Sequence, residues 1–325
     1  MKNKTKTILK ITVPLLLGVI LVWYSLSKVS LEVLIEHFKK ANYAWVILGL
    51  IFGLLSHMSR AYRWKFMIAP LGYSLRFSNS LMAVFAAYLV NYTIPRAGEV
   101  TRATIVTNYE GIPFEKGFGT IVAERVADLV MIMTIVLITL FLEYDFIYQF
   151  FADRFNPNKI MIGLFGLVIL AVLFFFFIKK SSSMIAVKIK TFVNGLIEGV
   201  LSIFKMEKKW PFIFHTLFIW TMYVLMFYVT TFAFKETTGI PLAAILIGFI
   251  SASFSIAATN GGIGSYPLAV YAAFSIFNIA EEPSIAFGWV MWSSQTLMIV
   301  LLGGLSLIYL PIYNRMHSKD SIKST

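Results

Sequence analysis

The chain has 325 residues, of which 58% are hydrophobic and 14% are charged, and its mean hydropathy is +0.79. Soluble domains carry about 25% charged residues, so this composition excludes a soluble globular protein and indicates a polytopic membrane protein. The absence of cysteine excludes disulfides, thiol catalysis and cysteine metal sites. The net charge of +12 does not indicate nucleic-acid binding, because the basic residues cluster at the ends of apolar segments, where they meet anionic lipid headgroups.

The apolar segments predict an all-α membrane protein with about six full spans. The start, Met1 to Leu26, has a basic head and an apolar run like a signal peptide. It lacks a small-residue cleavage site and is long enough to span, so we expect an uncleaved first helix. In chain order, the predicted spans are Ile8–Ser27, Tyr43–Ser59, Phe118–Leu142, Lys159–Ile178, Trp210–Phe234 and Ser284–Pro311.

Two further apolar stretches, Ser74–Asn108 and Pro241–Ile279, are interrupted. Each consists of two shorter pieces around a glycine-rich or proline-bearing break. Pieces of that length are typical of re-entrant or discontinuous helices rather than full spans. We therefore expect two broken helical hairpins beside the full spans, all in one transmembrane domain over residues 1–325.

Two segments have the pattern of helices that lie along a membrane surface. In Leu31–Lys40 the apolar residues recur at i, i+3, i+4 and i+7, opposite Glu32, Glu36 and Lys39, a spacing typical of an interfacial helix. Met184–Lys205 carries a similar apolar stripe. We interpret both as amphipathic connectors.

The distribution of basic residues predicts the orientation. If both broken stretches are re-entrant and the N-terminus is cytoplasmic, most of the 28 Lys and Arg residues lie on the cytoplasmic side, as the positive-inside rule requires. The C-terminus is then cytoplasmic too. We expect a multi-pass protein of a bacterial-type cytoplasmic (inner) membrane, whose first hairpin enters from the cytoplasm and whose second enters from outside.

A weak internal similarity pairs the two hairpins. Asn91, before Pro95 and Gly98, corresponds to Asn260 before the glycines of the second break. Two corresponding broken segments of opposite orientation are typical of an inverted-repeat transporter site. This predicts repeat halves around 43–142 and 210–311, with chance similarity among apolar segments as the open alternative.

The first break, Asn91 to Arg102, brings Arg96, Glu99 and Arg102 into an apolar stretch. Charge inside a bilayer is costly and usually faces a cavity, a partner or a substrate. One interpretation is a structural ion pair, since Glu99 and Arg102 are i, i+3 neighbours. The other, which we favour because the Pro-x-x-Gly break carries the charges, is a cationic cradle for a phosphate headgroup.

The next helix carries Glu124, Arg125 and Asp128. Glu124 and Asp128 are i, i+4 neighbours on one face, and Asp128 lies roughly 15 Å along the axis from Phe118, close to the midplane. A carboxylate at that depth needs a partner, for which Arg125, Arg96 and Arg102 are the candidates. A buried structural salt bridge and a proton- or substrate-coupled carboxylate are both open interpretations.

The second break, from Thr259 to Pro267, carries no charge. Its small and amide residues could let the backbone approach a ligand, or could only mark tight helix packing. The candidate residues there are Asn260, Gly261, Gly262 and Gly264.

Arg60, Arg63 and Trp64 follow the predicted second span. Residues of these types usually anchor a span at the lipid–water interface, and this is the interpretation we favour. A contact to a lipid headgroup is the alternative.

Together these motifs resemble the transmembrane, flippase-like domain family named after lysylphosphatidylglycerol synthase. The resemblance covers nearly the whole chain, but the second break lacks the proline before and the acidic residue after the glycines that family members often have. The synthase's cytosolic aminoacyl-transferring domain has no counterpart here. The residues that carry the resemblance are Arg60, Arg63, Trp64, Asn91, Pro95, Arg96, Gly98, Glu99, Arg102, Glu124, Arg125, Asp128, Gly261, Gly262 and Gly264.

The resemblance implies lipid handling and does not imply synthesis of an aminoacylated lipid. We expect a lipid translocase for an anionic phospholipid or isoprenoid-phosphate headgroup, with membrane lipids as partners, no nucleic acid, no cofactor and no metal. Arg96 and Arg102 would bind phosphate, and the carboxylates would balance or couple charge. A non-transport scaffold of envelope metabolism is the alternative. A lipid-modifying enzyme is the third reading, and we do not expect it because no Cys or His lies near the cluster in the sequence.

Overall fold

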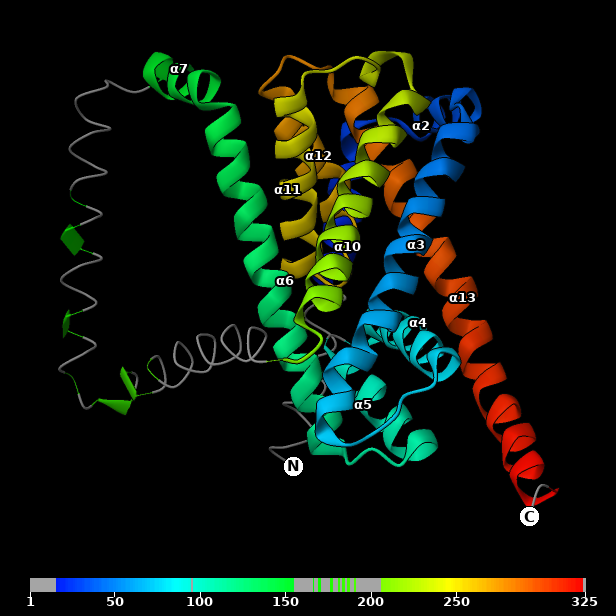
Figure 1. The fold of residues 1–325 in the computed structure, drawn as a ribbon. Helices are drawn as coiled ribbons and strands as arrows, with labels where there is room; N and C mark the ends of the chain where they lie inside the picture. Colours follow the sequence, from blue (N-terminus) through cyan, green and yellow to red (C-terminus); the bar gives the residue numbers. More distant parts are fainter. Residues whose placement is uncertain are drawn as a thin grey trace, which may run out of the picture. The chain divides into compact units, whose positions relative to one another are not determined.

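A computed structural model describes residues 16–94, 96–154 and 206–323, with isolated residues between 166 and 190. Every regular element among these residues is helical (Figure 1), which confirms the all-α prediction. The chain forms two compact units. The larger consists of Met1–Val122 and Trp210–Thr325, and the smaller is Ala123–Lys209; each is described by itself.

The helical elements of the described residues follow one another along the chain. They are α2 (Leu31–Lys40), α3 (Tyr43–Ile68), η1 (Ala69–Leu71), α4 (Phe77–Thr93), α5 (Ala97–Glu110), α6 (Phe114–Leu142), α7 (Tyr144–Arg154), α10 (Lys209–Thr230), η2 (Thr231–Ala233), η3 (Lys235–Thr237), α11 (Leu242–Ala258), α12 (Ser265–Ser275) and α13 (Glu281–Lys323).

Four helical segments in the described residues are long and apolar enough to cross a membrane. They are Tyr43–Leu71, Phe114–Leu142, Lys209–Ala233 and Glu281–Met316. The helix Leu16–Lys28 and α2 form a fifth candidate, bent by 81° at their junction.

Other parts of the sequence-based topology lie beyond the described residues. The predicted span Lys159–Ile178 falls there, as does most of the predicted surface helix Met184–Lys205. A multi-pass membrane protein is therefore supported, and the number of spans stays a prediction.

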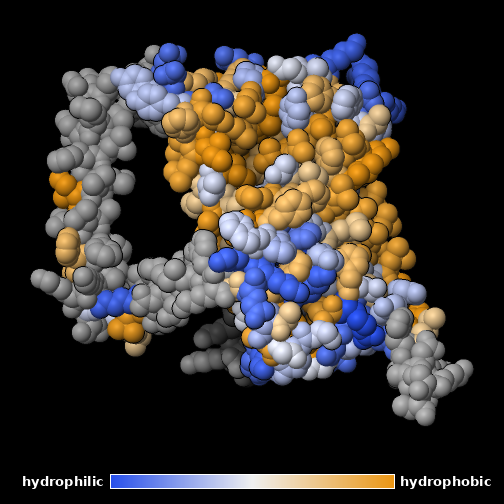
Figure 2. Space-filling view, viewed as in Figure 1, coloured by the Kyte–Doolittle hydropathy of each residue, from blue (hydrophilic) through white to orange (hydrophobic). Residues whose placement is uncertain are grey.

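The surface of the larger unit fits a lipid environment. Large apolar side chains at Leu297, Leu301, Leu305 and Ile308 are exposed along one side of α13, a spacing of four, four and three residues that keeps them on one face. Figure 2 shows hydrophobic residues over the middle of α3, α10 and α13 in this view. Apolar stripes that face outward are typical of helices whose surroundings are lipid tails.

Helices α3 and α10 pack closely and antiparallel. A Cβ atom at Gly49 would lie 2.5 Å from Thr230 Oγ1, and one at Gly53 would lie 2.8 Å from Met226 Sδ. Two glycines four residues apart let helix backbones approach in this way. Further along the pair, Arg63 Nη1 donates to Thr216 Oγ1. The contact positions rise along α3 as they fall along α10, which shows that the two helices run in opposite directions.

The first broken stretch forms a hairpin of α4 and α5. The side chain of Asn91 on α4 accepts a hydrogen bond from the backbone N–H of Gly98 at 2.8 Å, so it caps the start of α5. A Cβ atom at Gly98 would clash with the carbonyl oxygen of Ala87 and lie 2.7 Å from Asn91 Nδ2. The motif residues Asn91 and Gly98 therefore close the hairpin; Pro95 lies outside the described residues.

The second broken stretch forms a hairpin of α11 and α12. Its turn is held by neutral polar groups: Thr259 Oγ1 accepts from the N–H of Gly262 at 3.2 Å, and Ser265 Oγ lies 2.8 Å from the hydroxyls of both Ser255 and Thr259. Three glycines of the turn have left-handed backbone angles that other residues rarely adopt. The turn therefore needs glycine and hydroxyl groups and no charge.

The two hairpins have their bases at opposite ends of α13. At one end, which we call the Arg76 end, Arg76 and Asn79 from the base of α4 bond to Asn314. At the other, which we call the α2 end, Tyr271 of α12 donates to Glu281 at 3.2 Å. Figure 1 accordingly shows α4 and α5 toward the C-terminal part of α13, and α11 and α12 toward its N-terminal part.

The tips of the hairpins meet near the middle of α13. Asn260 Nδ2 donates to the carbonyl of Tyr92 at 2.8 Å, Trp292 Nε1 donates to the carbonyl of Gly261 at 2.8 Å, and Thr296 Oγ1 donates to the hydroxyl of Tyr92 at 3.2 Å. Thr296 is roughly 22 Å along the helix from Glu281 and roughly 27 Å from the Asn314 base contact. Backbone groups of both breaks are thus bonded inside the protein, which is the condition for irregular backbone at membrane depth.

The helix Leu16–Lys28 covers the second break. A Cβ atom at Gly264 would lie 2.5 Å from the backbone of Leu21, so the two backbones are in contact. Trp289 Nε1 donates to Ser25 Oγ at 3.0 Å. Gly264 is therefore required by the close approach of this helix.

Candidate functional site

Three buried arginines form the candidate site in the larger unit. Arg60, Arg63 and Arg102 are each 3% exposed or less, and we call them the arginine cluster. Arg60 and Arg63 lie about one turn apart on α3, and the guanidinium of Arg102 on α5 lies 3.8 Å above the ring of Trp64. A cation on the face of an indole is held by the ring quadrupole, so Trp64 links the arginines of the two helices.

The structure corrects the interpretation of Arg60, Arg63 and Trp64 as interface anchors. The predicted span ends at Ser59, but α3 continues to Ile68, so the arginines lie inside the helix. All three side chains are buried, whereas an anchor at the lipid–water boundary stays exposed. The end was misplaced because charged residues interrupt the local apolar pattern, which carries no information on the helices packed around it.

Hydroxyl and aromatic groups from two further helices hold the cluster. Arg63 Nη1 donates to Thr216 Oγ1 at 2.7 Å, and the guanidinium lies 5.1 Å from the ring centroid of Phe212. Trp64 Nε1 donates to Thr120 Oγ1 at 2.8 Å. The N-terminal parts of α6 and α10 therefore orient the planes of Trp64 and Arg63.

The cluster lies between the hairpin tips and the Arg76 end. Arg63 is about 8 Å along α3 from its last residue. Arg102 is about 12 Å along α5 from Glu110 at the hairpin base. Buried arginines at such a depth are costly unless anionic or hydrogen-bonding groups accompany them, so we take this cluster as the candidate site.

The acidic residues of α6 lie in the smaller unit. Glu124 and Asp128 are buried, and Arg125 Nη1 lies 3.4 Å from Asp128 Oδ2. This confirms Arg125 as one predicted partner of Asp128. Helix α6 begins at Phe114 rather than at Phe118. Asp128 therefore lies roughly 21 Å along the axis from the start of the helix, instead of the expected roughly 15 Å.

Arg96 and Arg102 occupy different environments, although both were predicted to bind phosphate. Arg96 is the exposed N-cap of α5, with a left-handed φ of 61°. Arg102 is buried about 9 Å further along the helix. Glu99 lies between them and is partly buried. The pairing of Glu99 with Arg102 and the binding of phosphate by Arg96 stay predictions.

The residues of the second break make contacts that favour the packing interpretation. Asn260 bonds to Tyr92, and a Cβ atom at Gly261 would lie 2.8 Å from the Tyr92 ring. One at Gly262 would lie 3.2 Å from Tyr266. Gly264 lies against the helix Leu16–Lys28. Asn260, Gly261, Gly262 and Gly264, the four predicted site residues of this break, therefore all contact other parts of the protein.

Two histidines lie near Arg60 and Arg63, which was not foreseen from the sequence. Ser59 Oγ is 2.8 Å from His215 Nδ1, and His215 precedes the Thr216 that binds Arg63. His57, one turn before Arg60, is buried with its ring 4.9 Å from that of Tyr88. His215 could not be found from the sequence because 156 residues separate it from Ser59. His57 could have been found, because it lies three residues before Arg60 and therefore on the same face of a helix.

Comparison with known proteins identifies the family of the chain. Residues 11–304 match the family described as the lysylphosphatidylglycerol synthase TM region. The chain belongs to this family. The match includes both hairpins and the arginine cluster, and it confirms the resemblance seen in the motifs.

The chain is also similar to the UPF0104 membrane protein MJ1595 of Methanocaldococcus jannaschii. The two are 28% identical over 310 residues, which cover 86% of this chain and 88% of the relative. No solved structure matches the chain.

Proposed function

We propose that this protein moves the anionic headgroup of a phospholipid or an isoprenoid phosphate between membrane leaflets, with the arginine cluster as its phosphate site. The observation that carries the proposal is the burial of Arg63 and Arg102 inside a membrane protein, beside the hydroxyl of Thr216 and the ring of Trp64. Membership of a family named after a lipid synthase's membrane region supports a role with lipids.

The chemistry of the cluster suits a phosphate. Guanidinium groups bind phosphate through two parallel hydrogen bonds and are less strongly hydrated than ammonium groups. Arg102 is held against Trp64, and Arg63 against Phe212 and Thr216. Such orientation reduces the ordering cost when a headgroup binds.

An inverted repeat would place this site in a transport path. The series α3, α4, α5 has 26, 17 and 14 residues, and the series α10, α11, α12 has 22, 17 and 11. The first helices of the two series are antiparallel, and the hairpins start from opposite ends. Transporters of this kind bind substrate near the midplane, between discontinuous helices.

The charges at the two ends favour a cytoplasmic Arg76 end. Six basic residues of the larger unit lie at or near it, against four toward the α2 end. The six are Lys65, Arg76, Lys116, Arg315, Lys319 and Lys323, and the four are Lys28, Lys39, Lys40 and Lys235. Basic residues collect on the cytoplasmic side of membrane proteins. The arginine cluster would then be the cytoplasmic part of the path.

The test is lipid movement in vesicles that contain the purified protein and fluorescent reporter lipids with different headgroups. We expect the wild type to move an anionic lipid faster than protein-free vesicles do, and Arg63→Gln and Arg102→Gln to lose most of that rate. Arg315→Gln is the matched control, because it removes the same charge from an exposed position. No movement of any headgroup above protein-free vesicles would overturn the proposal and favour a scaffold role.

The Ser59–His215 contact favours lipid modification as a second candidate function. A serine hydroxyl within hydrogen-bond distance of an imidazole is the arrangement of an activated nucleophile. Ser59 Oγ would attack the carbonyl carbon of an acyl ester while His215 takes the hydroxyl proton. The ester's C–O bond breaks and its alcohol leaves with that proton, and water then hydrolyses the acyl-serine to release the carboxylic acid. Mass spectrometry of the vesicle lipids tests this: a product that appears with wild type and is absent with Ser59→Ala would support it.

A further inference from the structure

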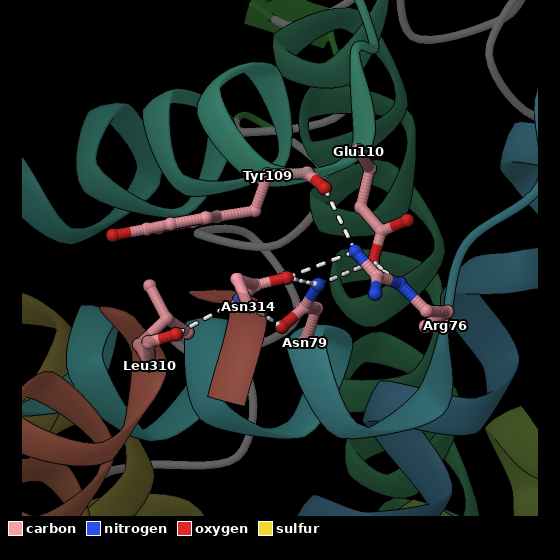
Figure 3. A network of polar contacts seen from close by, with 6 residues as sticks. All are labelled: Arg76, Asn79, Tyr109, Glu110, Leu310 and Asn314. Carbon is pink, nitrogen blue, oxygen red and sulfur yellow. Dashed lines mark hydrogen bonds and ion pairs between the residues drawn. The ribbon is translucent and has the colours of Figure 1, made fainter. Parts of the chain in front are cut away.

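A polar network ties the base of the first hairpin to α13 (Figure 3). Arg76 Nε lies 3.0 Å from Glu110 Oε1, and Arg76 Nη2 donates to the carbonyl of Tyr109 and to Asn314 Oδ1, each at 2.9 Å. Asn79 and Asn314 donate to each other at 2.8 Å. We call Arg76, Asn79, Glu110 and Asn314 the base latch.

The base latch joins three separate elements. Arg76 and Asn79 lie at the start of α4, Glu110 ends α5, and Asn314 is in the last part of α13. Asn79 is fully buried. Because a network of buried polar groups is stable only when its members are satisfied, removal of one amide should loosen the whole base.

A second latch holds the other end of the same hairpin. At the tip, Tyr92 is bonded by Asn260 from the second hairpin and by Thr296 from α13, and Trp292 bonds Gly261. We call Tyr92, Asn260, Trp292 and Thr296 the tip latch. Its bonds also join three elements: α4, the second break and α13.

The arginine cluster lies between the latches. Arg102 is about 8 Å along α5 from the tip and about 12 Å from Glu110 at the base. Arg60, Arg63 and Arg102 are closed to solvent in this structure. A charged headgroup can therefore reach them only after packed helices move apart, and the two latches are the polar contacts that hold the first hairpin in place.

We propose that the base latch and the tip latch are the two gates of the arginine cluster, and that each controls access from its own end. This rests on the proposed function. The structure is the state in which both gates are closed. Loss of one latch bond should raise the population open at that end about tenfold, since a net hydrogen bond is worth about one such factor.

Access to the cluster can be measured without any lipid movement. The chain contains no cysteine, so Thr216→Cys places a single thiol beside Arg63. A membrane-impermeant maleimide is applied to each side of vesicles that hold the full-length protein in one orientation. Ser74→Cys at the Arg76 end and Lys235→Cys at the α2 end, both exposed, identify the two sides.

We expect slow labelling of Thr216→Cys alone from both sides. Added Asn314→Ala, which removes three hydrogen bonds of the base latch, should raise the labelling rate at least tenfold from the Ser74 side only. Added Asn260→Ala, which removes one bond of the tip latch, should raise it about tenfold from the Lys235 side only. Thr104→Ala is the matched control, because Thr104 is exposed on α5 and its hydroxyl donates to the Val100 carbonyl within that same helix. It should leave the rate unchanged.

Two results would overturn the proposal: no change in either latch variant, or an equal rise from both sides in each. Thermal unfolding of each variant shows whether a two-sided rise comes from a misfolded chain, and Asn314→Gln and Asn260→Gln provide milder second variants. If labelling is one-sided as expected and no lipid moves in the vesicle assay, the gates stand and the proposed function fails.

Discussion

Gly98 shows how one residue can determine the shape of the first hairpin. Its hydrogen atom occupies the space between the Ala87 carbonyl and the Asn91 amide, and its N–H is bonded to Asn91. A side chain there must separate α4 from α5. The predicted site residue Asn91 and the motif residue Gly98 thus act first on backbone geometry.

Substitution of Gly98 by alanine should destabilise the protein by roughly 1–3 kcal/mol, the range for overpacking a tight contact. The midpoint of thermal unfolding in detergent measures this. Gly119→Ala is the control, because nothing lies within 4 Å of a Cβ atom at that helical position and alanine is the better helix former. An unchanged midpoint for Gly98→Ala would contradict the close packing of the hairpin.

Arg102 should not tolerate lysine. Lysine keeps the charge but loses the planar group that lies over Trp64 and binds phosphate through two bonds. We expect Arg102→Lys to slow lipid movement in the vesicle assay by about tenfold or more, while Arg315→Lys leaves the rate unchanged. Equal rates for Arg102→Lys and wild type would show that charge alone is needed at this position.

At the scale of elements, the two hairpins share the same helix–break–helix form, but different residues close their turns. The first is closed by an asparagine cap and has charged groups along α5. The second is closed by hydroxyl groups and left-handed glycines. Both leave backbone groups at the tip that the opposite hairpin or α13 satisfies, which lets each break lie inside the protein.

Labelling of single cysteines should distinguish the tips from the bases. Ser74→Cys and Asn278→Cys, both exposed near the hairpin bases, should label rapidly from opposite sides of the membrane. Ala97→Cys and Ser265→Cys lie where the tips meet and should label slowly from either side. Rapid one-sided labelling of Ala97→Cys would mean that α4 spans the membrane fully.

At the scale of the molecule, α13 connects both latches. Its first half carries Trp292 and Thr296 and its second half carries Asn314. Thr296 of the tip latch and Asn314 of the base latch are roughly 27 Å apart along α13, and the two latches share no side chain. Changes at well-separated sites usually add, so the latches should open independently.

The double variant Asn260→Ala with Asn314→Ala should therefore admit the maleimide to Thr216→Cys from both sides. Each rate should be close to that of the corresponding single variant. A double variant that labels from one side only would show that opening one gate closes the other. Vesicles with the Thr104→Ala variant provide the baseline rate.

Sequence reasoning located most of the elements and failed at particular contacts. The surface helix was predicted as Leu31–Lys40 and α2 has those bounds, because amphipathic spacing is a local property. The two breaks were also located from glycine, proline and charge. The end of the predicted span at Ser59 was wrong, since α3 continues to Ile68, and the contact of Ser59 with His215 was not foreseen. Both features depend on helices distant in the sequence.

The amino-acid sequence by itself determined that this is a helical membrane protein with two broken segments and costly charges beside one of them. Hydropathy, glycine placement and charge act on residues close in the chain, so they can be read in order. Only the tertiary structure decided that Arg60 and Arg63 are buried with Arg102, and that Asn260 bonds to Tyr92. Those facts depend on which helices pack together, and the packing joins residues more than 150 positions apart.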